Sequence, residues 1–542
     1  MQTLATLDWM MIGLYFAGIW AVAWFVSGRK TATHETTDGY FLAGRDVGWF
    51  IVGTALFASN IGSEHLVGLA GTGYGSGVAV GQFEVLASLI LLLLGWLFVP
   101  FYLRSGVVTM PEFLERRYSP AARSYLAWIS IIAYVLTKIS VTLYAGGIVY
   151  EVLIGGNFWT GALLIVVATG IYTIFGGLRA VLYTEMIQTF VMIGGAMLVT
   201  WVGLDKLGGW SSLRESVAPS FFNMWMPASD PSFPWTGILF GAPILGIWYW
   251  CTDQYIVQRV LSANGVDQAR RGSIFGGYLK ILPLFIFVLP GVVARALADK
   301  GDLVIARADH ALPVMIQSLL PIGLRGIVVA GFLAALMSSL SAVFNSCSTL
   351  ITFDVYQKMR PAASEAQLVR VGKIATVVLV MLGFAWIPFM KYISSQLYVY
   401  LQSVQAYISP PIAAVFLLGI AWKRVNAKGA LAALYSGFVL GLGRLVLELQ
   451  KDSLSGVLHW YADINFLHFA ILLFVVSVVI LVVVSLATAP EEENKLAGLT
   501  FATAAAGSQG SPASDPIWRG RDIWLSIALV ACVGAVWLYF WN

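Results

Sequence analysis

Charged residues are scarce in this sequence. Only 11% of its 542 residues are Asp, Glu, Lys or Arg, whereas 59% are hydrophobic, and the mean hydropathy is +0.81. A chain of this length with so few charges would be insoluble as a water-facing globule. The composition therefore predicts an all-α polytopic protein that lies in a lipid bilayer.

Several other features are missing, and each absence argues against a class of protein. The three cysteines, Cys251, Cys347 and Cys532, lie apart in apolar stretches, so no disulfide framework or metal site is indicated. The net charge is only +4, and no basic run with interleaved aromatic residues suggests nucleic-acid binding. The absence of a P-loop argues against ATP as the driving energy. The absence of N-x-[ST] sequons favours a bacterial inner membrane over a glycosylated cell surface.

Apolar runs of about 20 residues, long enough to cross a bilayer as a helix, recur along the whole chain. The first run has no basic segment before it and no small-residue cleavage site after it, so we expect a retained helix and not a signal peptide. The runs predict about fourteen transmembrane helices, at 7–27, 47–72, 79–103, 122–154, 157–177, 182–206, 234–258, 272–297, 322–353, 366–388, 395–421, 427–449, 465–488 and 520–541.

The distribution of Lys and Arg predicts how these helices are oriented. Most of the 32 basic residues fall in the odd-numbered connections, which are therefore expected to be cytoplasmic. With an even number of spans, both termini would then lie on the extracellular or periplasmic side. The polar, small-residue tract 489–515 is expected to be a flexible cytoplasmic linker before the last helix.

Five of the charged residues inside predicted spans stand out: Glu64, Glu84, Lys138, Asp253 and Lys280. A charge at the centre of a spanning helix costs roughly 2.5–3.5 kcal/mol, so each needs a partner or a wet cavity. For both glutamates and Lys280 the neighbouring polar groups favour a functional role. For Lys138 and Asp253, pairing between helices or snorkelling explains the charge equally well.

Two polar, glycine-containing stretches predict broken helices. FASNIGSEHLVGLAG, residues 57–71, lies in the second span, and GIWYWCTDQYIVQR, residues 246–259, lies in the seventh. An unwound turn at this depth would free backbone carbonyls for a small cation and would have to line a cavity. Because the two stretches are five spans apart, the second would begin from the opposite side of the membrane, as in inverted repeats.

A third polar cluster, ALMSSLSAVFNSCST at residues 335–349, is rich in hydroxyl groups. Most serines in membrane helices bond their own backbone or a neighbouring helix. The adjacent pair Ser338 and Ser339 could instead combine with freed carbonyls into a neutral cage of oxygen atoms. Such a cage suits a hard monovalent cation.

Six stretches carry a family resemblance: FASNIGSEHLVGLAGTG, VTMPEFLERRY, WYWCTDQYIVQR, GYLKILP, LMSSLSAVFNS and SPPIAAVFLLGIAWKRVN. Together they resemble the sodium/solute symporter family, and within it the sodium/glucose cotransporters. The resemblance implies a LeuT-type core of two inverted five-helix repeats with broken second and seventh helices. It divides the chain into a first helix and loop at 1–46, repeats at 47–208 and 209–421, and peripheral helices at 422–542.

The resemblance also implies a sugar site with a gate on each side. The expected sugar-binding residues are Asn60, His65, Glu84, Tyr249, Trp250, Lys280 and Gln402. Tyr249 resembles an aromatic gate toward the cytoplasm, and the outer lid is expected at Leu69, Phe83 and Tyr398. One position of the sugar site departs from the family, since Gly246 stands where a threonine or asparagine often contacts the sugar.

For sodium, the resemblance implies a site of carbonyl and hydroxyl oxygens from Ala58, Ile61, Ala335, Ser338 and Ser339. It also points to a second sodium site, with Glu185 in place of the family's aspartate and Ser341 beside it.

The sequence therefore predicts a sodium-coupled symporter that imports a neutral hexose by alternating access. The residues themselves support a neutral ligand, because Glu84 and Lys280 would cancel each other's charge, while amides suit a sugar rim and an aromatic ring suits its C–H face. A myo-inositol or polyol symporter and a sugar-gated sodium sensor or channel remain alternatives. An enzyme that uses Glu64 and Glu84 as paired carboxylates is disfavoured, because no soluble nucleotide-sugar domain is present.

Overall fold

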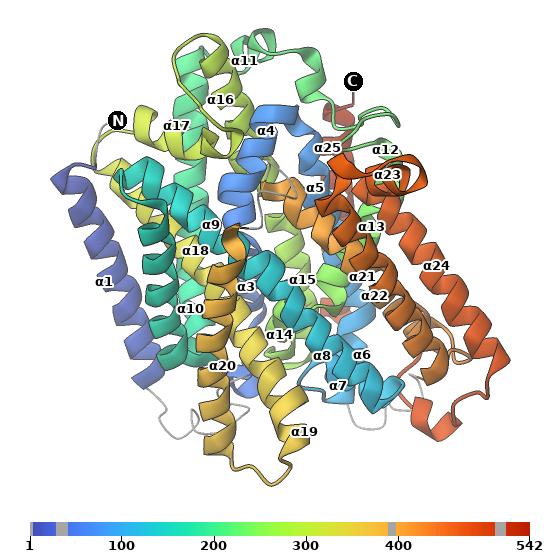
Figure 1. Cartoon of the computed structure of the whole chain (residues 1–542). Helices are drawn as coiled ribbons and strands as arrows, with labels where there is room; N and C mark the ends of the chain where they lie inside the picture. The colour runs from blue at the N-terminus through green and yellow to red at the C-terminus, as the bar shows by residue number, and fades with distance from the viewer. Residues whose placement is uncertain (1–3, 29–41, 389–396, 504–515, 542) are drawn as a thin grey trace.

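The structure is a computed structural model that describes residues 4–28, 42–388, 397–503 and 516–541. These residues form a helical bundle without a β-strand (Figure 1). Ten of its helices are long and apolar enough to cross a membrane, and three shorter apolar helices, at 6–22, 49–60 and 158–170, lie among them in the described part of the chain. The chain is thus a multi-pass membrane protein, and the count of fourteen spans stays a prediction.

The first half of the chain supplies a first set of helices. They are α1 (Thr6–Gly28), α3 (Trp49–Asn60), α4 (Ala70–Ser76), α5 (Gln82–Leu93), α6 (Val99–Ser105), α7 (Met110–Arg117), α8 (Pro120–Tyr134), α9 (Ser140–Val149), α10 (Phe158–Leu207), α11 (Trp210–Ser216), α12 (Trp235–Phe240), α13 (Ala242–Ile247) and α14 (Gln254–Leu261).

The second half supplies the rest. They are α15 (Gly265–Leu279), α16 (Leu289–Asp299), α17 (Ala311–Leu319), α18 (Leu324–Thr349), α19 (Gln357–Met359), α20 (Glu365–Trp386), α21 (Leu397–Ala421), α22 (Ala427–Leu449), α23 (Gly456–Asp463), α24 (Phe466–Ala487) and α25 (Pro516–Tyr539).

Several spans contain π-helical turns, in which the backbone bonds run to the fifth residue. They are η3 (Glu64–Leu69), η5 (Leu94–Phe98), η6 (Val135–Ile139), η7 (Tyr150–Ile154), η9 (Trp248–Thr252), η10 (Leu284–Val288) and η12 (Leu350–Tyr356). Such turns are rare and occur frequently at functional sites. Three of them, η3, η6 and η9, carry intramembrane polar residues that the sequence had singled out.

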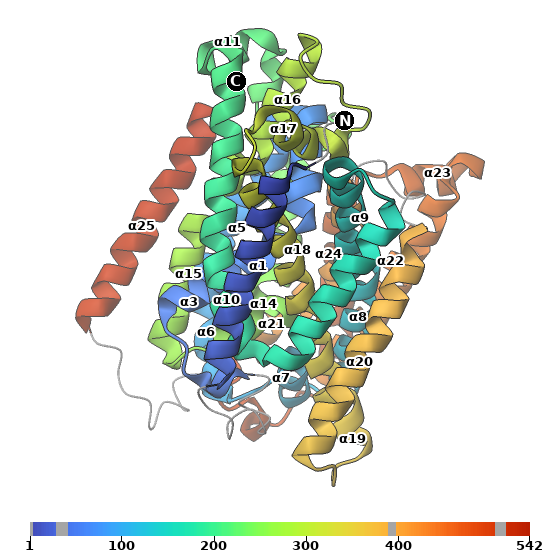
Figure 2. The ribbon, with the colours of Figure 1, turned by 90° about the vertical axis from the view of Figure 1, so that its left-hand side faces the viewer.

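The predicted spans 157–177 and 182–206 are joined in one helical segment, α10. A straight helix of this length would hold its ends about 75 Å apart. Both ends instead lie close to α17, since η7, which precedes α10, contacts α17 and Gly203 near its other end abuts Met315 of α17. The segment therefore runs down beside α9 and returns to α11, as Figure 2 shows.

Both predicted breaks are present in the backbone. Helix α3 ends at Asn60, and Ile61 is extended with φ −74° and ψ 103°. In the seventh span, residues 246–252 remain helical and the break lies at Asp253, with φ −80° and ψ 128°. The reason is local, because the Asp253 side chain accepts a hydrogen bond from the Tyr255 amide and caps the start of α14.

The two breaks contact each other. The Tyr255 hydroxyl donates to the carbonyl of Ser59, and Arg259 Nε donates to Ser59 Oγ at 2.8 Å. The helix ends that unwinding exposes are therefore bonded across the two spans, which satisfies groups that lipid could not. This junction lies inside the bundle, where all three side chains are buried.

Helix α1 lies at the edge of the bundle and is held by one buried ion pair. Asp8 Oδ2 accepts from Arg325 Nη2 at 2.7 Å, and Asp8 Oδ1 accepts from the amides of Gly323 and Gly326 at 2.8 and 2.9 Å. A Cβ at Gly326 would lie 2.5 Å from the Asp8 backbone, so only glycine permits this approach. The carboxylate thus ties α1 to the start of α18.

We expect Asp8→Ala to destabilise the folded protein by about 3–5 kcal/mol, because Arg325 would remain buried without its counter-charge. Thermal unfolding in detergent measures this as a lower melting temperature. Asp299→Ala is the matched control, since it removes an exposed ion pair with Arg295 and should cost less than about 1 kcal/mol. Equal losses in the two variants would contradict the anchoring role of Asp8.

Candidate functional site

A cavity lies between the two helix breaks. Its walls come from α3 and η3, α5, η6, α13 and η9, the turn after α15, and α21. All seven predicted sugar-binding residues line it: Asn60, His65, Glu84, Tyr249, Trp250, Lys280 and Gln402.

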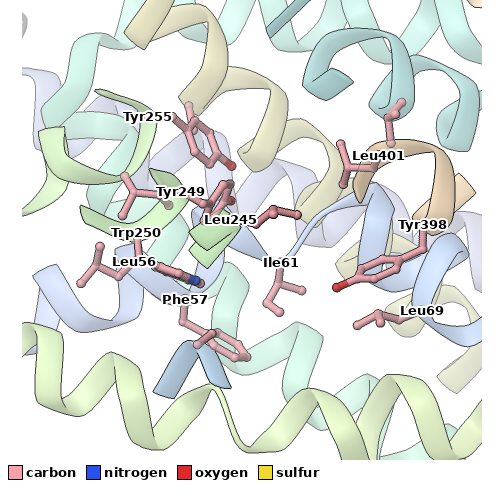
Figure 3. Close-up of a cluster of buried hydrophobic side chains, with 14 of the residues drawn as sticks. Leu56, Phe57, Ile61, Leu69, Leu245, Tyr249, Trp250, Tyr255, Tyr398 and Leu401 are labelled. Carbon is pink, nitrogen blue, oxygen red and sulfur yellow. The ribbon is translucent and has the colours of Figure 1, made fainter. Parts of the chain in front are cut away.

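The predicted outer lid is brought together only in part. Phe83 and Tyr398 line the cavity, and their ring centroids are 5.7 Å apart in an edge-to-face arrangement. Leu69 is buried beside Tyr398 (Figure 3) but does not line the cavity. Tyr249 and Trp250 lie on the other side of Ile61 in the same view, with ring centroids 5.1 Å apart. Aromatic pairs therefore stand on two sides of the break.

A chain of polar contacts crosses the cavity through Asn60. Lys280, at the turn after α15, forms an ion pair with Glu84 and donates to Asn60 Oδ1 at 2.5 Å. Asn60 Nδ2 in turn donates to the Tyr249 hydroxyl at 2.9 Å. His65 Nε2 lies 3.2 Å from Glu84. The last residue of α3 thus connects the seventh span to the eighth, which fixes the backbone where the helix stops.

A second ion pair, which was not among the predicted site residues, also lines the cavity. Lys138 Nζ lies 2.5 Å from Glu64 Oε1 and donates to the Tyr249 hydroxyl at 3.2 Å. The available signal was the presence of two opposite charges inside predicted spans. Gln405 was also missed, although it lies one turn beyond Gln402 on the same helix face.

The two ion pairs leave the cavity nearly neutral. Glu84 is balanced by Lys280 and Glu64 by Lys138, and all four side chains are at most 5% exposed. An anionic ligand would bring a charge that no surplus cation here offsets. Hydroxyl groups, which donate and accept, match the mixture of amide, ammonium and carboxylate groups instead. The cavity is suited to an uncharged, hydroxyl-rich ligand.

Gly246 in the cavity wall explains how the chain tolerates its departure from the family. A Cβ at this position would lie 2.1 Å from Ile90 Cδ1. Ile90 therefore fills the space that a threonine or asparagine side chain would take. The wall is more apolar here than the family pattern implies.

The predicted sodium residues lie on two contacting elements, the end of α3 and the middle of α18. A Cβ at Gly62 would lie 2.5 Å from Ser339 Oγ, so the unwound turn sits directly against this serine. Ser338 Oγ is buried and lies near the Glu185 carboxylate, without a hydrogen bond of good geometry to any described residue. Because α3 ends at Asn60, the carbonyls of its last turn lose helical partners. Oxygen ligands for a small cation are therefore concentrated here.

Glu185 and Ser341 are held by separate partners. Glu185 Oε1 lies 3.3 Å from Arg259 Nη2, and Ser59 Oγ lies 3.3 Å from the same carboxylate. Ser341 Oγ accepts from Thr173 Oγ1 at 2.8 Å. The glutamate thus already has a buried counter-ion, and a sodium ion there would share it with Arg259. The second sodium site stays a prediction.

Comparisons with known proteins place this geometry in context. Residues 40–437 match the model of the sodium:solute symporter family. The chain is 40% identical to sodium/glucose cotransporter 4 of Mus musculus, with 92% of this chain and 78% of the relative covered. It is 37% identical to the sodium/myo-inositol cotransporter of Homo sapiens, with 92% and 76% covered. Among solved structures, a Na⁺-coupled sialic acid symporter in an outward-open state matches with a TM-score of 0.75 and 22% identity, over 90% of this chain and 99% of that one.

These matches confirm two of the predictions made from the sequence. The structural likeness confirms the predicted fold class, a LeuT-type helical membrane protein. The family model and the curated relatives confirm the resemblance read from the six stretches. The individual sugar-binding, gate and sodium residues stay predictions, as do the boundaries of the two repeats.

We expect Gly62→Ala to reduce the stabilisation of the protein by sodium, because the new methyl group would displace Ser339 Oγ from the unwound turn. The measurement is the rise in melting temperature on sodium addition, since a ligand of the folded state stabilises it by mass action. Gly194→Ala is the matched control, because a Cβ there meets nothing within 4 Å. A sodium-induced shift as large in Gly62→Ala as in the parent would contradict this placement of the ion.

Proposed function

The chain belongs to the sodium:solute symporter family, and from this premise we propose that it imports a neutral sugar, a hexose such as glucose or galactose, together with sodium. The observation that carries the proposal is the cavity between the two breaks, where two balanced ion pairs and three amides meet aromatic rings. Each feature matches one part of a sugar. Polar groups bind its hydroxyls, and a ring packs against its C–H face.

Asn60, His65, Glu84, Lys280 and Gln402 would bind the sugar hydroxyls, while Tyr249 and Trp250 would pack against the ring. A carboxylate and an ammonium in one site give both an acceptor and a donor of charge-assisted hydrogen bonds. Removal of either group would leave its partner buried and unpaired, so each should matter strongly for transport.

Sodium would bind at Ala58, Ile61, Ala335, Ser338 and Ser339, next to the break and not in the sugar cavity itself. Its ligands come from α3 and α18, so a bound ion would hold the two elements together and order the end of α3. Asn60 lies at that end, and ordering it raises the affinity for sugar. Linkage makes the effect reciprocal, so that sugar raises the affinity for sodium.

The cycle is alternating access between an outward-facing and an inward-facing cavity. Leu69, Phe83 and Tyr398 would close the outer side and Tyr249 the inner side. We place the protein in a plasma membrane, such as a bacterial inner membrane, with both termini outside, in accordance with the positive-inside rule. The membrane potential then adds roughly 2.3 kcal/mol per sodium charge per 100 mV to the inward driving force.

A myo-inositol or polyol symporter is the second candidate. The human sodium/myo-inositol cotransporter is 37% identical to this chain, and the match covers 92% of this chain. A cyclic polyol offers the same rim of hydroxyl groups as a hexose. The apolar wall at Gly246 and Ile90 favours neither ligand over the other. The two candidates differ in the substrate alone, so a transport assay separates them.

The test is uptake into sealed proteoliposomes with radiolabelled glucose, galactose or myo-inositol, with and without an inward sodium gradient. We expect the gradient to drive accumulation of one of the hexoses above its equilibrium level, and unlabelled competitors rank the substrates. Accumulation of inositol alone would replace the hexose with the polyol. Sodium entry without accumulation of any sugar would overturn the proposed function in favour of a channel.

We predict that Lys280→Ala and Gln402→Ala each reduce sugar uptake more than about tenfold, because each removes a direct hydrogen bond to the sugar. Both variants should still insert into the membrane. Ser339→Ala should raise the sodium concentration needed for half-maximal uptake. Lys451→Ala and Gln450→Ala are matched controls that lie outside the cavity, near the end of α22. Unchanged uptake in Lys280→Ala, Gln402→Ala and Ser339→Ala would refute these residue assignments.

A further inference from the structure

The ion pair of Glu64 and Lys138 has no role in the binding scheme above. Both side chains are buried, 3% and 4% exposed, and lie 2.5 Å apart. They join the π-helical turn after the first break, η3, to a π-helical turn in the fourth span, η6. Neither helix needs this pair for its own backbone bonds. The pair therefore has to be explained by what else it contacts.

Lys138 contacts the hydroxyl of Tyr249, the predicted inner gate. Its ammonium group donates to the hydroxyl at 3.2 Å, and Asn60 Nδ2 donates to the same oxygen at 2.9 Å. The phenolic oxygen therefore has two donors within hydrogen-bond distance. The ring is thereby held in one direction from two sides, by the end of α3 and by the fourth span.

Glu64 is in turn held in place by its own neighbours. Ser63 Oγ donates to Glu64 Oε2 at 3.2 Å and lies 3.1 Å from Thr142 Oγ1. Thr142 is one helical turn beyond Lys138 in the fourth span. The Glu64 carboxylate is thus linked to the fourth span twice, directly through Lys138 and through Ser63 and Thr142. These two links restrict the positions that Lys138 can take.

We propose that the Glu64 and Lys138 ion pair positions Tyr249 and keeps the inner side of the cavity closed until the second and fourth spans move relative to each other. This inference rests on the proposed function and assigns to the same site the two charges that it left unused. Separation of the pair would leave two buried charges without partners. The inner gate would therefore stay closed until the two spans move, because that movement separates Lys138 from Glu64 and releases Tyr249 at the same time.

The experiment compares three variants with the parent in proteoliposomes: the neutral double variant Glu64→Gln with Lys138→Met, Tyr249→Phe, and all three changes together. The double variant removes both charges at once, so no unpaired charge remains. The main readout is sodium entry in the absence of sugar, which reports a gate that opens without its substrate. The half-saturating sugar concentration is the second readout.

We expect the double variant and Tyr249→Phe each to raise sugar-free sodium entry about tenfold, the factor that corresponds to one lost charge-assisted hydrogen bond. The triple variant should leak no more than Tyr249→Phe alone, because the phenylalanine already lacks the hydroxyl to which Lys138 donates. The matched control is Asp8→Asn with Arg325→Met, which neutralises a buried ion pair that does not line the cavity. It should lower thermal stability without raising the leak.

Two results would overturn the proposal. If the effects of the double variant and Tyr249→Phe multiply in the triple variant, Lys138 does not act through the Tyr249 hydroxyl. If Tyr249→Phe, a small change that keeps the ring, leaks no more than the parent, the hydroxyl does not hold the gate, whether or not the double variant folds. A parent protein that accumulates no sugar would refute the proposed function separately, because sodium entry is measured without sugar.

Discussion

A charge inside a bilayer needs an opposite charge or hydrogen-bond donors and acceptors, and this constraint determines how the centre of the molecule is assembled. The Glu84 and Lys280 pair joins the third span to the eighth, the Glu64 and Lys138 pair joins the second to the fourth, and the Glu185 and Arg259 pair joins the sixth to the seventh. The first two pairs join spans that are not consecutive in the sequence, and the third joins two consecutive spans. The buried charges therefore specify which helices are neighbours at the level of the cavity, while apolar packing elsewhere follows with less selectivity.

Backbone groups obey the same constraint at the two breaks. An unwound turn in lipid would expose amides and carbonyls at a cost of several kcal/mol each. Here the breaks face each other, so that Tyr255 and Arg259 from one bond Ser59 from the other. This pairing leaves the carbonyls at the end of α3 free to bind a cation beside α18. It also leaves the polar side chains that face the cavity free to bind a sugar. A single local arrangement thus provides two adjacent but chemically different sites, one of neutral oxygens and one of paired charges.

The sequence alone predicts the fold class and most of the cavity wall, because both depend on residue type and spacing. A polar residue such as Asn60 or Lys280 in an apolar run has few explanations, and all seven expected sugar ligands line one cavity. What the sequence does not specify is which partner each charge has. Lys138 could have snorkelled or paired with several carboxylates, and its contact with Tyr249 depends on how the fourth and seventh spans cross. The break at Asp253, seven residues after Gly246, shows the same limit, since the break lies where the Asp253 carboxylate caps the start of α14 and not at the glycine.

The two charge pairs of the cavity need not serve the same purpose. Glu84 and Lys280 lie with His65, Asn60 and the amide of Gln402, so their hydrogen bonds can be exchanged for those of a ligand that enters the cavity. Lys138 donates a second hydrogen bond to a protein hydroxyl, and Glu64 also accepts from Ser63. A pair that is bonded to such fixed protein groups responds to movement of its helices, whereas a pair with neighbours that a ligand can replace responds to binding. Asn60 contacts Lys280 on one side and Tyr249 on the other. A ligand bound next to the Glu84 and Lys280 pair would therefore affect the Glu64 and Lys138 pair through Asn60.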